Sequence, residues 1–331
     1  MNVQRWIARR ETSWRQLEAL LKQSEKKGLK SLNSDQIRNM ASLYRSVSAD
    51  LARARSHQVG TATIKDLQGL TTRGYSQIYQ GSRRQDWKEV VDFYSYGFPE
   101  IVQQSWSYIT IATLLFFIGG AVGWWYSWQD ESFMTLVLGS GFVEEVRNSQ
   151  ELWTVSIMGE EPTASSYIMI NNIAVCLRAM VGGVTQYMPQ IPIITPPGAF
   201  TIYLLVFNGI MIGSVFSLTA QVGLGYDLLG FVSAHGALEL PAIFFAGGAG
   251  LLLARAILLP GRYKRLDALK LYGLQAAKLL YGIVPMLVIA GCVEGFFSPQ
   301  TWIPNAVKYV VGIAIFIIFV QYCRRRRPAI S

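Results

Sequence analysis

The sequence predicts an all-α, polytopic integral membrane protein with about six transmembrane helices and an N-terminal cytoplasmic helical bundle. Two observations predict this class. Hydrophobic residues make up 51% of the 331 residues and charged residues only 15%, which is too apolar for a pair of water-soluble domains. In addition, 17 of the 30 Lys and Arg residues lie before Ser107, so the rest of the chain must contain apolar lengths that can cross a membrane.

Residues 1–85 are predicted to form a basic cytoplasmic head made of helices. Apolar residues recur there at three- and four-residue spacing, and Gly28 predicts the end of the first helix. Asn33, with Gln36 three positions later, has the pattern of a capping box and predicts the start of a second helix. A weaker third helix should be interrupted at Gly74. The two apolar stripes consist of Val3, Trp6, Ile7, Trp14, Leu17, Leu20 and Leu21, and of Ile37, Met40, Tyr44, Val47, Leu51 and Ala54.

Residues 86–107 connect the head to the first apolar segment and are dense in aromatic side chains, among them Trp87, Phe93 and Phe98. Pro99 interrupts the run. We predict an interfacial, aromatic-rich helix here, because aromatic side chains favour the boundary between water and hydrocarbon.

Six apolar segments then make up a transmembrane domain predicted over residues 108–323. They cover residues 108–128, 167–188, 199–220, 228–259, 275–296 and 303–323. At 1.5 Å per residue the fourth segment exceeds a hydrocarbon core of about 30 Å. We therefore expect a break or kink at Pro241, and a kink at Pro285 in the fifth segment.

Positive charge predicts the orientation of these segments. The head, the loop between the fourth and fifth segments and the tail at residues 324–331 are all rich in Lys and Arg. The connection over residues 129–166 instead holds Arg147 among seven carboxylates. Because basic flanks stay cytoplasmic, we expect an acidic outer loop and both termini in the cytoplasm. We expect no cleavable signal peptide, because the first residues lack an apolar region.

Polar side chains at membrane depth are costly and mark a candidate site. His235 and Glu239 stand four residues apart and would share one helix face. The leading interpretation is structural, with Arg178 neutralising Glu239 across a helix interface. A proton or ion relay is the alternative. The predicted intramembrane polar cluster consists of Arg178, His235, Glu239, Asn171, Asn172 and Asn208.

Catalytic and metal sites are weaker interpretations of the same residues. A zinc site would need more ligands than His235 and Glu239 supply. A protease pair of His235 with Ser214 or Ser233 has no recognisable oxyanion hole. The three Cys residues fall in or beside apolar segments, so neither disulfides nor a thiolate metal site is indicated. We expect no catalytic residue, no metal and no cofactor.

Glycines in the apolar segments predict close helix packing. Gly209 and Gly213 form a G-x-x-x-G pattern, and Gly247, Gly248 and Gly250 follow in the fourth segment. Packing within one chain is the main interpretation, and homo-oligomerisation through the same faces is the alternative.

The order of these motifs resembles the stage II sporulation protein M family of bacterial integral membrane proteins. The resemblance covers nearly the whole chain. It is carried by N-N-I-A-V from Asn171, F-N-G-I-M-I-G from Phe207, S-A-H-G-A-L-E-L-P-A-I from Ser233 and I-A-G-C-V-E-G-F-F-S-P from Ile289. It implies a bacterial inner-membrane protein that works in a complex. In the sporulating branch, family members are implicated in engulfment, where they anchor peptidoglycan-degrading partners.

The leading hypothesis for function is therefore a non-enzymatic scaffold or complex subunit that recruits partner proteins, with roles in cell-envelope or peptidoglycan remodelling. The alternative is a channel or transporter with a polar path around His235, Glu239 and Arg178. An intramembrane hydrolase is disfavoured. We expect membrane lipids and proteins as partners, and no nucleic acid, because no groove-reading motif is present.

Overall fold

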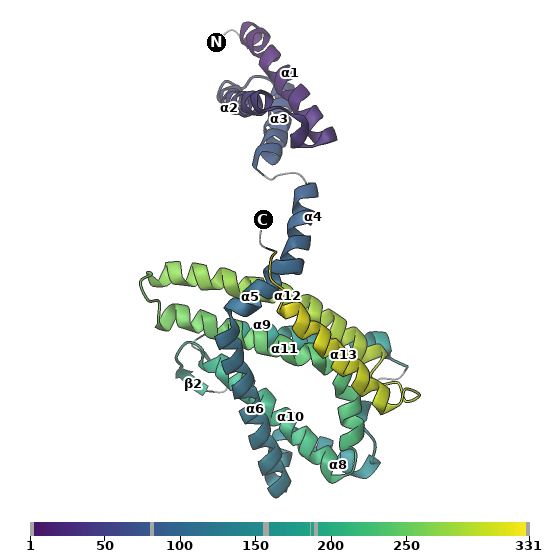
Figure 1. The fold of residues 1–331 in the computed structure, drawn as a ribbon. Helices are drawn as coiled ribbons and strands as arrows, with labels where there is room; N and C mark the ends of the chain where they lie inside the picture. Colours follow the sequence, from purple (N-terminus) through teal and green to yellow (C-terminus); the bar gives the residue numbers. More distant parts are fainter. Residues whose placement is uncertain (1–2, 80–82, 155–158, 186, 189–190, 329–331) are drawn as a thin grey trace. The chain divides into compact units, whose positions relative to one another are not determined.

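The computed structural model describes residues 3–79, 83–154, 159–185, 187–188 and 191–328. Parts of the predicted head, outer connection, second segment and tail fall in the gaps and lie outside the described residues. The chain divides into two compact units, Met1–Asp92 and Phe93–Ser331. Over the described residues, the regular structure of both is helical, as predicted, apart from two short strands in the second unit (Figure 1).

The first unit contains α1 (Val3–Lys27), η1 (Leu29–Ser31), α2 (Ser34–Ser56), α3 (Thr61–Tyr79) and α4 (Arg83–Asp92). Its core is built from the two predicted stripes and from α3, with Leu17 and Leu21 of α1 in one cluster with Met40 and Val47 of α2 and Leu67 of α3. Burial of these apolar side chains is the main force that holds the three longer helices together.

Two predicted helix boundaries in this unit are confirmed. Gly28 has a φ of 79° and donates its N–H to the carbonyl of Ser24, so it ends α1 as a glycine past a helix terminus commonly does. Asn33 Oδ1 accepts from the Gln36 N–H at 2.8 Å, and Gln36 Oε1 accepts from the Asn33 N–H at 2.9 Å. This is the predicted capping box.

The predicted interruption at Gly74 is wrong, because α3 continues through this residue. A Cβ at Gly74 would lie 2.7 Å from Cδ2 of Tyr44. The glycine therefore allows α3 to approach the Tyr44 ring of α2 closely, and the helical hydrogen bonds around it remain intact.

Polar contacts fix how these helices meet. The Asp50 carboxylate of α2 is 1% exposed and accepts from Arg10 Nε at 2.7 Å and from Trp14 Nε1 at 2.9 Å, both on α1. Arg73 of α3 donates two hydrogen bonds of 2.8 Å to the Glu25 carboxylate. These bonds lower the pKa of Glu25 below its ordinary value.

The segment predicted as one interfacial helix over residues 86–107 is divided by the structure. It contains the end of α4, a π-helix η2 (Phe93–Gly97) and α5 (Phe98–Gln104). Pro99 lies in the first turn of α5, where its missing N–H costs no helical hydrogen bond. Phe98 is 1% exposed and packs against Phe245, so this part of the segment belongs to the core of the second unit.

Among its described residues, the second unit has six helices long and apolar enough to cross a membrane, which is the predicted number. They are α6 (Trp106–Gln129), α9 (Glu161–Val181), α10 (Ala199–Gln221), α11 (Gly225–Leu258), α12 (Arg265–Phe296) and α13 (Asn305–Cys323). Helix α11 contacts the other five and is the most buried of them, so it is the centre of the unit.

Two predictions about these helices are corrected. The second segment begins at Glu161, with Pro162 in its first turn, and ends at Val181 before the Gly182-Gly183 pair. Farther along the chain, β1 (Tyr187–Met188) and β2 (Ile191–Ile194) form a short antiparallel pair of strands. Of the break or kink predicted at Pro241, the break is absent, because α11 is helical through this residue. Neighbouring helices pack around α11 and stabilise it despite the proline.

The acidic connection after α6 is folded. It contains α7 (Glu131–Leu138) and α8 (Ser140–Ser149), and the Asp130 side chain caps α7 by accepting from the Ser132 N–H at 2.8 Å. Met134, Val143 and Val146 form a small core with Leu218 of α10. We call α7 and α8 the cap of the second unit.

Helices α11 and α12 run side by side for most of their length (Figure 1). With 34 and 32 residues, they are about 51 and 48 Å long. Both exceed a hydrocarbon core of about 30 Å. The turn that joins them, at residues 259–264, is exposed at Leu259 and Tyr263.

Candidate functional site

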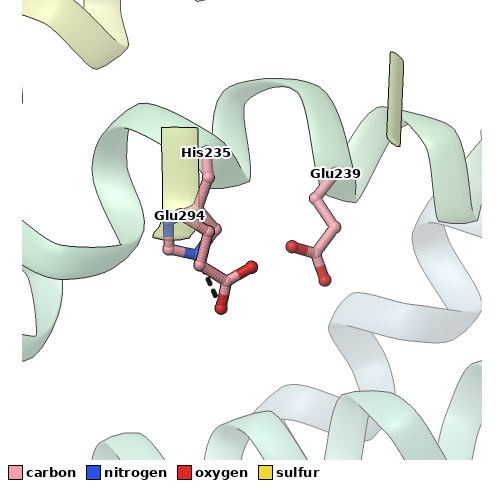
Figure 2. Close-up of side chains that lie close together, drawn as sticks. All are labelled: His235, Glu239 and Glu294. Atoms are coloured by element: carbon pink, nitrogen blue, oxygen red, sulfur yellow. Dashed lines mark ion pairs between the residues drawn. The ribbon is translucent and has the colours of Figure 1, made fainter. Parts of the chain in front are cut away.

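Helices α11 and α12 bring three ionisable side chains together inside the second unit (Figure 2). His235 and Glu239 project from neighbouring turns of α11, as their four-residue spacing predicts. Glu294 reaches them from the last turns of α12. His235 Nε2 lies 3.9 Å from Glu294 Oε1, which is too long for a hydrogen bond. We call His235, Glu239 and Glu294 the His–Glu cluster.

Glycines allow neighbouring helices to close around this cluster. At Gly312 of α13, a Cβ would meet the carbonyl of Ser233, so α13 approaches the turn of α11 that carries His235. At Gly295, beside Glu294, a Cβ would lie 2.5 Å from Cβ of Ser165 in α9. Ser165 Oγ donates to the carbonyl of Gly291 at 2.8 Å and fixes α9 on α12.

The other nitrogen of His235 is held by a polar group beyond α12. His235 Nδ1 and Ser298 Oγ lie 3.0 Å apart and share a hydrogen bond. The Phe231 ring packs edge-on against the imidazole, with ring centroids 5.1 Å apart. Lys308 of α13 is 6% exposed and donates from Nζ to the Ser298 carbonyl at 2.7 Å. The orientation of His235 is therefore set by its surroundings.

The cluster is nearly sealed from its surroundings. The side chains of His235 and Glu294 are 6% and 14% exposed, and Glu239 is partly buried. Glu294 Oε2 is buried and has no hydrogen-bond partner among the described residues. No Lys or Arg of the described chain forms an ion pair with either carboxylate. Two such carboxylates side by side need a proton or a cation to offset their repulsion.

The chemistry of these groups would suit a divalent cation. One ligand atom from each of the three residues lies within 4.8 Å of the others. Imidazole and carboxylate together are ligands for zinc, iron and manganese, although a bound ion would require somewhat shorter spacing. The sequence predicts too few ligands because only His235 and Glu239 share a segment; Glu294 of α12 supplies the third group.

A cavity of about 580 Å³ lies next to the cluster. Phe231 and Ser298, which both touch His235, line it, together with Asp227, Asn305 and Lys308. Residues of the connection that follows the cap also line it. His235 therefore contacts two residues in the wall of this cavity, whose lining is partly polar.

The structure does not assemble the remaining residues of the predicted polar cluster. Arg178 is exposed in the last turn of α9 and forms no ion pair with Glu239, which corrects the pairing expected from the sequence. Asn208 donates to the Leu204 carbonyl of its own helix at 2.7 Å. Asn171 donates to Asn172 at 3.4 Å. In their place, Glu294 and Ser298 lie beside His235, and Lys308 bonds to Ser298.

The predicted packing glycines all lie at contacts between helices. Gly209 and Gly213 of α10 face α6, where a Cβ would meet the carbonyls of Phe116 and Gly120. The glycines of α11 face three different helices. A Cβ would meet Leu205 of α10 at Gly247, Ile109 of α6 at Gly248, and Ala179 of α9 at Gly250. All of these contacts are within one chain.

Comparison with known families gives two matches. A family model described as stage II sporulation protein M matches residues 112–299, which is more than half of the chain and includes the whole His–Glu cluster. A model described as a domain of unknown function (DUF8413) matches residues 4–80. Searches of curated proteins and of solved structures found no match.

Proposed function

The chain belongs to the stage II sporulation protein M family, and from this premise we propose that it is a non-enzymatic subunit of a bacterial inner-membrane complex. In this proposal it recruits partner proteins that remodel the cell envelope, and both of its termini are cytoplasmic. Six helices able to cross a membrane would anchor it.

The observation that carries the proposal is that the chain has a folded, charged surface before its first membrane helix and another after it. Residues 1–92 have a hydrophobic core of their own. The cap that follows α6 also has its own small core. A chain that needed only attachment to a membrane would not need two such surfaces.

Their charges are opposite, which suits different partners. On α2, Arg38, Arg45 and Arg53 are exposed and lie on one side of the helix. On the cap, Glu144 and Glu145 of α8 are exposed. Complementary charge steers association and excludes wrong partners, so we assign an acidic partner to the head and a basic one to the cap.

Affinity capture of the full chain from the membranes of its own bacterium, after cross-linking, tests the proposal. Wild type should retain at least one partner in a fixed ratio. The head variant Arg38→Glu/Arg45→Glu/Arg53→Glu should lose the partner bound inside. The cap variant Glu144→Lys/Glu145→Lys should lose the partner bound outside and keep the first.

The matched control is Arg9→Glu/Lys26→Glu/Lys27→Glu, which makes the same change of charge at exposed positions of α1. It should retain every partner. If wild type retains no partner in a fixed ratio, or if the control loses as much as the head variant, the scaffold proposal fails.

The His–Glu cluster favours a second candidate function, the relay of protons across the membrane. Its support is the pair of carboxylates, which form no ion pair with a Lys or Arg among the described residues. Glu294 lies 3.9 Å from His235, and His235 shares a hydrogen bond with Ser298 at the wall of the cavity. Buried carboxylates and imidazoles are common carriers of protons in membranes. The near-complete burial of the cluster argues for a relay between side chains and against an open channel.

Proton uptake by liposomes containing the purified chain, followed with a pH-sensitive dye, tests this candidate. Glu239→Gln and Glu294→Gln should each abolish uptake, whereas Glu144→Gln on the cap should have no effect. Equal rates in protein-free liposomes and in liposomes with wild type would remove this candidate and leave the scaffold proposal intact.

A further inference from the structure

A second cavity, of about 660 Å³, lies between α5, α6, α11 and α13. Its volume is within the range of roughly 300–1,000 Å³ that is typical of small-molecule sites. Most of its lining is apolar and much of it aromatic, including Phe244 and Phe245 of α11 and Phe316 and Phe319 of α13. Phe316 is 49% exposed, so the cavity is bordered by a surface that faces lipid when the helices span a membrane.

Positive charge is placed at one end of this cavity. Arg324 and Arg326, which follow the last turn of α13, belong to its lining. Gln103 of α5 donates to the carbonyl of Cys323 at 2.8 Å and to that of Arg325 at 3.0 Å, so the backbone that carries the arginines is fixed. The Arg325 guanidinium lies over the Tyr322 ring, 6.0 Å from its centroid, and is not part of the lining.

The dimensions match one leaflet of a bilayer. Arg324, just past the end of α13, follows Phe316 by eight positions, which is a rise of about 12 Å along the cavity. Half of a hydrocarbon core of about 30 Å is about 15 Å. A molecule that lay along these phenylalanines with its polar end at the arginines would therefore occupy the depth of a single leaflet.

We propose that this cavity binds one anionic phospholipid from the leaflet at the C-terminal end of α13. Its phosphate would accept hydrogen bonds from Arg324 and Arg326, because guanidinium groups pair with phosphate through two N–H groups at once. One acyl chain would lie against Phe244, Phe316 and Phe319. Basic pockets between membrane helices are typical sites for anionic head groups. This site does not depend on the scaffold or relay proposals.

Native mass spectrometry of the full chain tests the proposal. The protein is purified in detergent and titrated with phosphatidylglycerol, with zwitterionic phosphatidylcholine, or with inorganic phosphate. Wild type should retain one phosphatidylglycerol in preference to phosphatidylcholine. In Arg324→Gln/Arg326→Gln, that binding should weaken roughly 30-fold, since each arginine contributes about 1 kcal/mol and 1.4 kcal/mol corresponds to tenfold.

Two further variants separate this site from general surface charge. Arg262→Gln/Lys264→Gln removes two exposed charges from the turn between α11 and α12 and should leave binding unchanged. Val320→Trp keeps every charge but fills the cavity, so it should weaken binding. The proposal is overturned if phosphatidylcholine binds as well as phosphatidylglycerol, if inorganic phosphate competes at equal concentration, if both double variants lose binding equally, or if Val320→Trp binds as wild type.

Discussion

Replacement of Gly123 by alanine should separate α6 from α10, and this is the sharpest test of how the membrane helices pack. A Cβ at Gly123 would lie 2.7 Å from Ile210 Cα and closer still to the Ile210 carbonyl oxygen. Ordinary contacts of a Cβ begin at 3.4 Å, so the two backbones must move apart by at least 0.7 Å at this point. At Gly120, one turn earlier on the same helix, a Cβ would lie 3.6 Å from its nearest neighbour.

The expected magnitude follows from this displacement. A radial gap of 0.5–1 Å between two surfaces removes about a quarter to a half of the energy of each dispersion contact. The contacts affected extend along the interface, because the glycines at 119, 209 and 213 make equally close backbone contacts there. Forcing an extra methyl group into such packing costs about 1–3 kcal/mol. Both alanine variants gain up to about 1 kcal/mol of helix propensity, so the difference between them isolates the packing cost.

Unfolding of the purified full chain in mixed micelles with increasing sodium dodecyl sulfate, followed by tryptophan fluorescence, measures this difference. Gly123→Ala should be about 1–3 kcal/mol less stable than Gly120→Ala, which should match or exceed wild type. If Gly123→Ala unfolds at the same midpoint as Gly120→Ala, the glycine contacts between α6 and α10 do not hold the helices together.

Three further predictions concern the first unit and are read by hydrogen exchange in the full chain. Asp50→Ala removes the buried acceptor of Trp14 and should destabilise the unit by about 3 kcal/mol, seen as faster exchange throughout its core; unchanged exchange would contradict the buried contact. Asn33→Ala removes the capping box and should cost about 1 kcal/mol, with the first turn of α2 exchanging faster than its centre, whereas equal acceleration along the helix would argue against a cap. Arg73→Ala should cost at most about 1 kcal/mol, because both partners are about a third exposed. Arg73 lowers the pKa of Glu25, so the stability that the pair contributes is complete above the ordinary pKa of 4.5. It disappears as the pH falls through the lowered pKa. A pH-independent difference in stability between Arg73→Ala and wild type would be inconsistent with the pair.

The features that could be predicted from the sequence are local or depend on composition. Gly28 and the Asn33–Gln36 box end and begin helices through contacts with residues three or four positions away, so their effect is contained in the sequence itself. The six membrane helices follow from the length and hydropathy of each segment, which require no knowledge of neighbours.

The candidate site could be predicted only in part, because its other half comes from another helix. The four-residue spacing of His235 and Glu239 places them on one face, but periodicity does not tell which helix that face meets. Glu294 comes from the last turn of α12, where glycines at 291 and 295 allow α9 to enclose it. Arg178 was expected at mid-depth because its segment was extended to residue 188, whereas α9 ends at Val181 and leaves Arg178 in the last turn.

The length of α11 and α12 limits where the turn between them can lie relative to the hydrocarbon core. Even at a tilt of about 40°, the steepest usual for such helices, crossing about 30 Å of hydrocarbon takes about 39 Å, or some 26 residues. A straight α11 that crosses the hydrocarbon once would therefore leave about eight of its residues outside it. Insertion of a short epitope between residues 259 and 264 should leave all six crossings undisturbed, and an antibody against it would report the sidedness of the protein in intact vesicles.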